Sequence, residues 1–416
     1  MSSYWKDNSV LFKDGDVIWM TAPVSSGMVT FDFVPAIGVK ESLEWVTDIL
    51  KPKDGIGSEQ RISTRPIPRQ SFTYTIFLHT EEEQSRFEAM MFGWQKRYFA
   101  LPILTEKVLH TGTITAEDRT ITIDTTKGDF REGGYVEIWK SSTANELLRI
   151  STVAANLLTL ETPVVTTYTG DKFIIPHRIT QVSSVVKRRN SEVPFSQIQI
   201  TFIVKDNVLL SGYTAVQEYL GLPIVTTGSF IGQRDKEYSS ESDSFLQDYN
   251  TGAFDYSSDS EFNIIGQNHT FYNQTQEACW NFRLFLHSLV GRQGTFWLPT
   301  YRNDLTPTEA ISAVETDINI QNIKLADNMG VNSLRTNLAF ILPDGTIICR
   351  AITNIVEVDD DEETITIDTA LGVEVAMGGC TISFLDLCRQ ASDVVDIEWT
   401  EPNKNLVNQV LLAVKA

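Results

Sequence analysis

Residues that could perform catalysis are few in this sequence of 416 residues and lie far apart. The five histidines form no His-x-x-x-His or His-Glu-x-x-His pair, and no Gly-x-Ser-x-Gly motif surrounds a candidate nucleophile. His79 and His269 each lie shortly before a predicted helix, which favours an edge or capping role over metal ligation. His177, beside Arg178, ends a predicted strand, where we expect a surface or interface position. The sequence therefore predicts no catalytic residue, no cofactor and no enzyme activity.

Acidic side chains are two further candidates for chemistry. Asp124 and Glu161 could act as the paired carboxylates of a glycoside hydrolase. Acids recur at comparable places elsewhere in the chain, which favours a role in turns instead. The acidic run at residues 359–363 offers oxygen ligands to a divalent cation. It lacks the alternate spacing and the turn glycine of a calcium loop and joins two predicted strands, so we expect a solvated hairpin tip and no metal site.

Arginines cluster just before one predicted strand. Glu59, Arg61, Arg65 and Arg69 lie in a stretch that also holds two prolines. Arginine is favoured at polar interfaces because its planar fork pairs carboxylates through two hydrogen bonds. We therefore regard these four residues, together with Trp297, as candidates for an interface with a second copy of this acidic chain. The alternative is a polar edge strand, whose prolines block pairing with other strands.

The composition is that of a globular protein with a strong acidic excess. Hydrophobic residues make up 42% of the chain, charged residues make up 21%, and the formal net charge is −20. This charge disfavours nucleic-acid binding, which depends on lysine and arginine. The one basic cluster, at residues 187–189, is short, and we expect a solvated loop there.

The cysteines and the start of the sequence bear on where the protein is made. All four cysteines lie in the second half and none forms a Cys-x-x-Cys pair, which disfavours metal and redox sites. No signal-peptide pattern begins the sequence, and no apolar stretch approaches the roughly 20 residues of a membrane span. We expect a soluble protein, made in a reducing cytoplasm and not stably inserted in a membrane.

Alternating β-branched and aromatic residues dominate the pattern and predict a mainly β protein. The clearest alternation occurs at residues 71–76, 120–124, 197–202 and 364–368. Two segments have helical spacing instead. Residues 81–97 carry an apolar stripe behind an acidic first turn, which complements the helix dipole. Residues 275–290 carry a similar stripe and are followed by Gly291, a typical helix stop.

The order of these elements occurs twice in the chain. Phe-Ala-Leu-Pro at residues 99–102 follows the first predicted helix, and Phe-Trp-Leu-Pro at residues 296–299 follows the second, at an offset of 197 residues (296 − 99). This repeat is too long for a solenoid unit. The sequence therefore predicts two tandem β-sandwich or β-barrel domains, residues 1–206 and 207–416, each with one helix packed on a sheet.

A smaller repeat lies within each half. It consists of a strand, an acid or polar turn, a loop, glycine or asparagine, and a second strand. It occurs at residues 121–138, 158–175, 323–341 and 365–384. Glycine and asparagine tolerate the positive φ that such loops need. Two such units in each half predict an inserted small β-domain or β-barrel, at about residues 105–178 and 303–389.

Short motifs in both halves resemble tail-tip proteins of long-tailed bacteriophages. The motifs are residues 43–50, 57–61, 65, 68–70 and 72 in the first half, and residues 296–300, 397–399 and 407–414 in the second. The resemblance implies a distal tail protein or a hub protein, built on a tail-tube-like β-sandwich with a flanking helix that is present here twice. The second half lacks the Gly-Ser-Glu-Gln-Arg block of residues 57–61, and its nearest match is residues 232–234.

The resemblance and the missing catalytic motifs together predict a structural virion protein. We expect a ring at the tip of the virion tail, made in the host bacterial cytoplasm, which joins the tail tube to the distal hub, the fibres or receptor-binding proteins. Because the fold occurs twice, a trimer would have pseudo-six-fold symmetry, and a hexamer is the alternative. The acidic balance fits an inner channel that does not grip passing DNA.

Two other functions remain as alternatives. A carbohydrate-binding or adhesion module is motivated by Trp139, Tyr168 and Trp297, because exposed rings stack on sugars. A cell-wall hydrolase that uses Asp124 and Glu161 is the least favoured.

Overall fold

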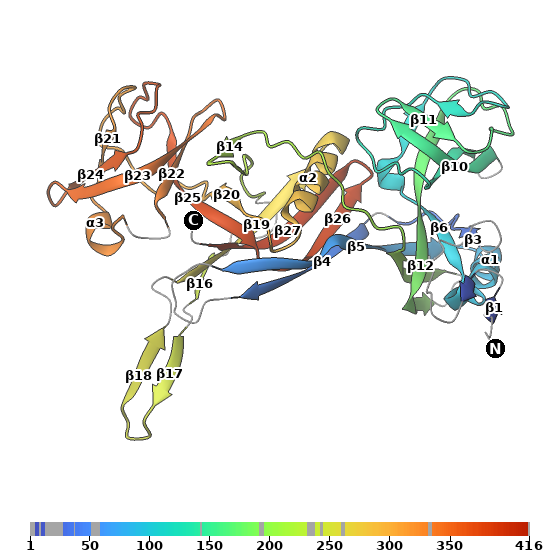
Figure 1. Ribbon diagram of the computed structural model, residues 1–416, viewed down its shortest axis with the longest axis horizontal. Helices are drawn as coiled ribbons and strands as arrows, with labels where there is room; N and C mark the ends of the chain where they lie inside the picture. Colours follow the sequence, from blue (N-terminus) through green and yellow to red (C-terminus); the bar gives the residue numbers. More distant parts are fainter. Residues whose placement is uncertain are drawn as a thin grey trace. The chain divides into compact units, whose positions relative to one another are not determined.

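A computed structural model of the chain describes residues 5–7, 10–12, 28–36, 38–50, 59–141, 144–190, 195–230, 238–241, 244–258, 263–331 and 335–414. These residues form large antiparallel sheets with few helices, so the mainly β prediction is confirmed (Figure 1). Within these residues, no helix has the length and apolar character needed to cross a membrane.

The chain divides into two compact units whose segments alternate along the sequence. The first unit comprises Met1–Glu41, Arg69–Asn207 and Glu398–Lys404. The second unit comprises Ser42–Pro68, Val208–Ile397 and Asn405–Ala416. Two long strands, β4 (Val39–Leu50) and β5 (Gln60–Leu78), therefore contribute residues to both units.

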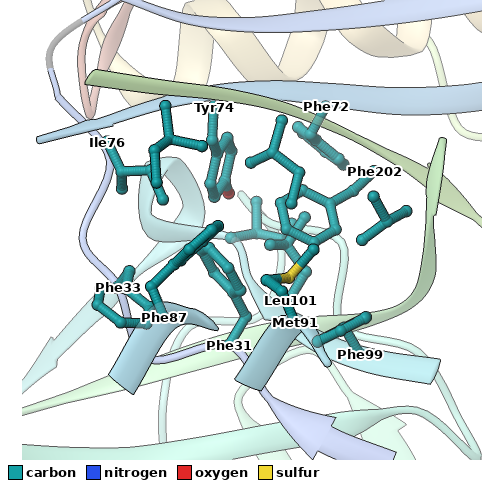
Figure 2. Close-up of a cluster of buried hydrophobic side chains, with 14 of the residues drawn as sticks. Phe31, Phe33, Phe72, Tyr74, Ile76, Phe87, Met91, Phe99, Leu101 and Phe202 are labelled. Carbon is teal, nitrogen blue, oxygen red and sulfur yellow. The ribbon is translucent and has the colours of Figure 1, made fainter. Parts of the chain in front are cut away.

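The core of the first unit is rich in aromatic side chains. β5 alternates, so that Phe72 and Tyr74 point into this core, and Figure 2 shows them facing Phe31, Phe87 and neighbouring apolar residues. The rings of Phe31 and its neighbour across the core, Phe202, meet edge to face at 4.8 Å. The helix α1 (Glu81–Met91) covers this core through Phe87 and Met91, as its apolar stripe predicts.

Helix ends follow the local sequence in both units. Thr80 accepts a hydrogen bond from the backbone of Glu83, and the Glu83 carboxylate accepts from Thr80 in return, which is a capping box. The helix α2 (Gln276–Leu289) begins behind Thr275, whose side chain accepts from Ala278. It ends at Leu289 and is followed by Val290 and Gly291, which both have positive φ.

The main sheets of the two units have the same strand order. In the first unit, the sheet order is β6 (Tyr98–Pro102), β12 (Lys172–Asn190), β13 (Ser196–Val204) and β5. In the second unit, the order is β20 (Phe296–Pro299), β25 (Thr381–Gln390), β27 (Lys404–Ala413) and β19 (Ile264–Asn273). In each, a helix joins the last strand of this order to the first: α1 joins β5 to β6, and α2 joins β19 to β20.

The inserted β-domains also match strand for strand. In the first, the order is β8 (Thr120–Ile121), β11 (Leu157–Leu160), β10 (Ala144–Ala154) and β9 (Tyr135–Ser141), and β9 then pairs with β12. In the second, the order is β21 (Asp317–Gln321), β24 (Glu362–Ile367), β23 (Ile347–Glu357) and β22 (Asn337–Ile341), and β22 pairs with β25. Both have a register shift at the same place, after Ile150 in β10 and after Ile352 in β23.

The prediction of one strand in the smaller repeat was wrong. Residues 323–327 were expected to be extended, but the helix α3 (Leu325–Asn328) begins there. The strand that matches β8 is β21, which ends before this point. The buried Glu363 carboxylate accepts hydrogen bonds from the backbone of Ile323 and Ala326, at 3.0 and 2.9 Å, and so holds the start of α3 from a distant strand.

The remaining elements are short or peripheral to these sheets. They are β1 (Trp5–Asp7), β2 (Val10–Phe12), β3 (Met28–Thr30), β7 (Val108–His110), β14 (Glu218–Tyr219), β15 (Leu222–Pro223), β16 (Tyr238–Glu241), β17 (Ser244–Asp248), β18 (Phe254–Ser258), β26 (Val394–Glu401) and the 3-10 turns Trp94–Lys96 and Leu104–Glu106. β3 pairs in parallel with β6, and Ile224 forms the matching parallel bridge with Trp297. β26 pairs with β4.

Candidate functional site

The predicted arginine-rich strip runs along β5 and the residue before it. Glu59 accepts two hydrogen bonds from Arg389, at 2.7 and 2.9 Å, and both side chains are largely buried. Arg65 donates to the backbone oxygen of Glu44 at 2.9 Å and pairs with the Glu44 carboxylate at 3.1 Å. These contacts lie within the second unit, so Glu59 and Arg65 already have partners in their own chain.

Arg61 and Arg69 have different surroundings. Burial lowers the pKa of Arg61; the Glu59 carboxylate opposes this change, and the Arg389 guanidinium adds to it. The Nη1 atom of Arg61 is buried without a hydrogen-bond partner in the described part of the chain. Arg69 is exposed and belongs to the first unit. The predicted strip is thus divided between the two units and is mostly engaged within them.

Trp297, the fifth predicted interface residue, lies in the core of the second unit. It is 2% exposed, its indole Nε1 donates to the backbone oxygen of Tyr219 at 2.9 Å, and the two rings meet edge to face at 5.3 Å. A side chain enclosed in this way offers no surface to a second copy. The structure therefore assigns Trp297 to packing rather than to an interface.

The segment that contains the strip is held in the second unit through Asp393. The backbone of Trp45 donates to the backbone oxygen of Asp393, and the backbone of Thr47 donates to its carboxylate, both at 2.9 Å. Arg292 donates to the same carboxylate from its backbone and from its Nε, again at 2.9 Å. Burial would raise the pKa of Asp393, but the hydrogen bonds from Arg292 and Thr47 outweigh it and hold the pKa below its usual value.

Gly291 and His287 complete this seat. The backbone of Gly291 has a φ of 68°, and a Cβ there would lie 2.5 Å from the Asp393 carboxylate and 2.8 Å from the Trp45 Cβ. The Trp45 ring meets the His287 ring edge to face at 5.7 Å, and His287 Nδ1 accepts a hydrogen bond from the backbone of Leu210 at 3.1 Å. Together these contacts fix a strand from the first half of the chain, β4, in the second unit.

A second group of charges is buried in the first unit, and sequence reasoning misplaced it. His177 was expected at a surface or interface position, but it and its neighbour Arg178 are each 1% exposed, in the interior of β12. Arg178 donates to the backbone oxygen of Asp129 at 2.6 Å and pairs with its carboxylate at 2.8 Å. His177 lies 3.0 Å from the Glu137 carboxylate. The prediction was wrong because these partners come from distant parts of the sequence.

The second unit has the opposite charge at the matching position. Leu101 of β6 pairs with Arg178, whereas Leu298 of β20 pairs with Asp386. Asp386 is 2% exposed and accepts hydrogen bonds from Arg335 at 3.1 and 3.3 Å. Burial raises the pKa of Asp386, and Arg335 opposes this change. The acidic partner in the first unit and the basic partner in the second both precede a matched strand, β9 or β22.

The acids considered for catalysis or metal binding serve turns and pairs. Asp124 accepts hydrogen bonds from the backbone and the hydroxyl of Thr126, which lower its pKa. Glu161 pairs with Arg149 at 3.1 Å. Asp359 accepts from the backbone of two residues of its own acidic run, at 2.9 and 3.0 Å. No cluster of potential metal ligands occurs among the described residues.

The aromatic rings considered for sugar binding are mostly enclosed. Tyr168 is 3% exposed and Trp297 is 2% exposed, while Trp139 is half-buried and packs against Phe173. The basic residues 187–189 were expected in a loop, but they lie within β12, so that prediction was wrong. Residues 57, 58 and 232–234, which carry part of the resemblance, lie outside the described residues.

No protein-family model matches the sequence, and no curated protein matches it.

Proposed function

We propose that this chain is a structural component of a bacteriophage tail tip, which assembles into a ring between the tail tube and the distal hub, fibres or receptor-binding proteins. The observation that carries the proposal is the repetition of a whole module: strand, helix, strand, inserted β-domain and two closing strands, with the same pairing in both units. The motifs that resemble tail-tip proteins support the identification of this module.

Two modules in one chain halve the number of copies that a ring needs. Three chains would contribute six modules, which lets a three-fold assembly meet a six-fold tube. A hexamer would contribute twelve modules and is the alternative. The net charge of −20 is compatible with a channel that does not retain DNA.

The surroundings of the candidate residues support a structural role over the two alternatives. A carbohydrate-binding role needs exposed rings, and Tyr168 and Trp297 are buried. A hydrolase role needs two carboxylates available to a substrate. Asp124 is engaged in a turn and Glu161 in an ion pair.

The test is the mass of the purified protein across a concentration series, by light scattering, followed by negative-stain images. Rings of three copies with a central hole would support the adaptor, and rings of six would support the hexamer. Labelling with an antibody against the chain would place it at the distal end of the tail in purified virions. A monomer at all concentrations that never co-purifies with virions would refute the proposal.

A further inference from the structure

A hairpin of the second unit presents an unusual apolar face. β17 and β18 form a two-stranded sheet of their own (Figure 1). Leu246 pairs with Tyr256, so the two side chains share one face with Phe254, two residues along. Leu246 is 53% exposed, Tyr256 is 63% exposed and Phe254 is 64% exposed. A two-stranded hairpin is marginal in water, so such a face favours a docking function.

The stretch of sequence that contains this hairpin is acidic, and two of its acids, Asp248 and Asp255, lie in the hairpin strands themselves. Residues 237–263 contain no lysine or arginine. The seven acids in this stretch are Glu237, Glu241, Asp243, Asp248, Asp255, Asp259 and Glu261. A partner surface for this hairpin should therefore be basic as well as able to cover apolar rings.

The internal duplication identifies the counterpart of this hairpin in the first half. The helix caps Thr80 and Thr275 are equivalent, and they are separated by 195 residues (275 − 80). The same offset places Phe254–Ser258 on residues 59–63 (254 − 195 and 258 − 195). This counterpart is the segment that is seated in the second unit, where Glu59 binds Arg389 and the preceding strand β4 pairs with β26.

The duplication also identifies the counterpart of β26, the strand of the second unit that pairs with β4. Thr180 of β12 pairs with Val204, and Cys388 of β25 pairs with Ala413, at matching positions of the two sheets. Val186 follows Thr180 by six residues (186 − 180), and Val394, which begins β26, follows Cys388 by six (394 − 388). In both units an irregularity precedes this point: a register shift in β12 and the break between β25 and β26.

The counterpart of β26 in the first unit is therefore the outer end of β12, residues 186–190. This segment carries Lys187, Arg188 and Arg189, the only run of three basic residues in the sequence. It pairs with β13, and the described pairings of β12 with β6, β7 and β9 all lie before Val182. The acidic β17–β18 hairpin thus contains the counterpart of residues 59–63, and the basic end of β12 is the counterpart of β26, the strand that pairs with β4.

We infer that the β17–β18 hairpin of one copy docks on the outer end of β12 in the first unit of a second copy. Each second half then binds its neighbour as the first-half segment is bound by the second unit within one chain. The contact is heterologous, because the two surfaces differ, and repetition of it closes a ring when the rotation permits. This inference rests on the proposed function, since it specifies how the ring is held.

Two variants and their mixture test this contact. The hairpin variant replaces Leu246, Phe254 and Tyr256 by Ser. The β12 variant carries Lys187→Glu and Arg189→Glu. We expect each variant alone to lose the ring while circular dichroism shows that it stays folded. In the mixture, the β12 variant supplies an intact hairpin and the hairpin variant supplies an intact β12 end. We therefore expect dimers with one copy of each variant and no larger assembly. Mass photometry separates these species.

The control and the contrary outcomes distinguish this inference from the proposed function. Val314→Ser alters a side chain that is 82% exposed in the second unit but outside the hairpin, and it should leave the ring intact. A hairpin variant that still forms rings overturns the inference and leaves the proposed ring standing. A mixture that remains monomeric shows that the two surfaces do not meet, for instance because the hairpin binds the tail tube instead. A wild-type chain that is monomeric throughout overturns both.

Discussion

A substitution of Gly291 tests the seat that holds β4 in the second unit. In Gly291→Ala, the new Cβ must adopt a φ of 68° and approach the Trp45 Cβ at 2.8 Å and the Asp393 carboxylate at 2.5 Å. The left-handed conformation costs about 1–2 kcal/mol, and overpacking costs about 1–3 kcal/mol. We expect the free energy of unfolding to fall by about 2–5 kcal/mol, because the Trp45 Cβ is fixed by its backbone and cannot turn away.

Gly378 provides the matched control for this substitution. Its φ is 73°, close to that of Gly291, and nothing lies within 4 Å of a Cβ placed there. Gly378→Ala should therefore cost only the conformational part, about 1–2 kcal/mol. Urea unfolding followed by tryptophan fluorescence gives both values. If Gly291→Ala is no more destabilising than Gly378→Ala, the crowding at the seat is refuted, and with it the placement of β4 against Gly291.

Three further predictions concern stability. Arg178→Met removes one of the two arginines that pair with the buried Asp129 carboxylate, while Arg131 stays, and should lower the free energy of unfolding by about 1–3 kcal/mol, measured by urea unfolding. Phe31→Ala removes a fully buried ring and should cost about 3–5 kcal/mol, whereas Phe92→Ala, at a ring that is 80% exposed, should cost less than about 0.5 kcal/mol. The pKa of the Asp393 carboxylate is lower in the folded chain than in the unfolded chain. Its stabilising effect is therefore present above about pH 4 and is lost as the pH falls through the folded value. The stability difference between Asp393→Asn and wild type should shrink on acidification from about pH 7 to about pH 3.

Each of these predictions has a clear contrary result. An Arg178→Met variant as stable as wild type would show that the buried pair is not needed. Equal losses for the two phenylalanine variants would contradict the position of the first core. A constant difference between Asp393→Asn and wild type across the pH range would show that the carboxylate is not protected from protonation in the folded chain.

Local patterns predicted α1, α2 and most strands, because their causes lie in neighbouring residues. The stripe that includes Phe87 and Met91 and the caps at Thr80 and Thr275 are short-range features. The strand prediction for residues 323–327 was wrong because Ile323 and Leu325 alternate with polar or small residues, as in a strand. The helix there depends on Glu363, which no local pattern connects to it.

The seat around Asp393 was missed for a related reason. Its members, Trp45, Arg292 and Asp393, lie more than 100 residues apart in the sequence, and each has an ordinary role when considered alone. Gly291 was predicted only as a helix stop, although its close contacts make it part of the seat. The interface prediction for Trp297 failed because ring type alone does not distinguish a buried tryptophan from an exposed one.

Arg178 and Asp386 occupy matching strand positions but carry opposite charges, so each inserted domain fits only its own unit. An insert supplies the loop charge that neutralises the strand it returns to, Asp129 in the first unit and Arg335 in the second. A chimera with the inserts exchanged would set Arg178 beside an arginine and Asp386 beside an aspartate, each pair shielded from water. Recombination between the two repeated halves would therefore yield chains that fail to fold, so the duplication, once diverged in this way, resists being erased.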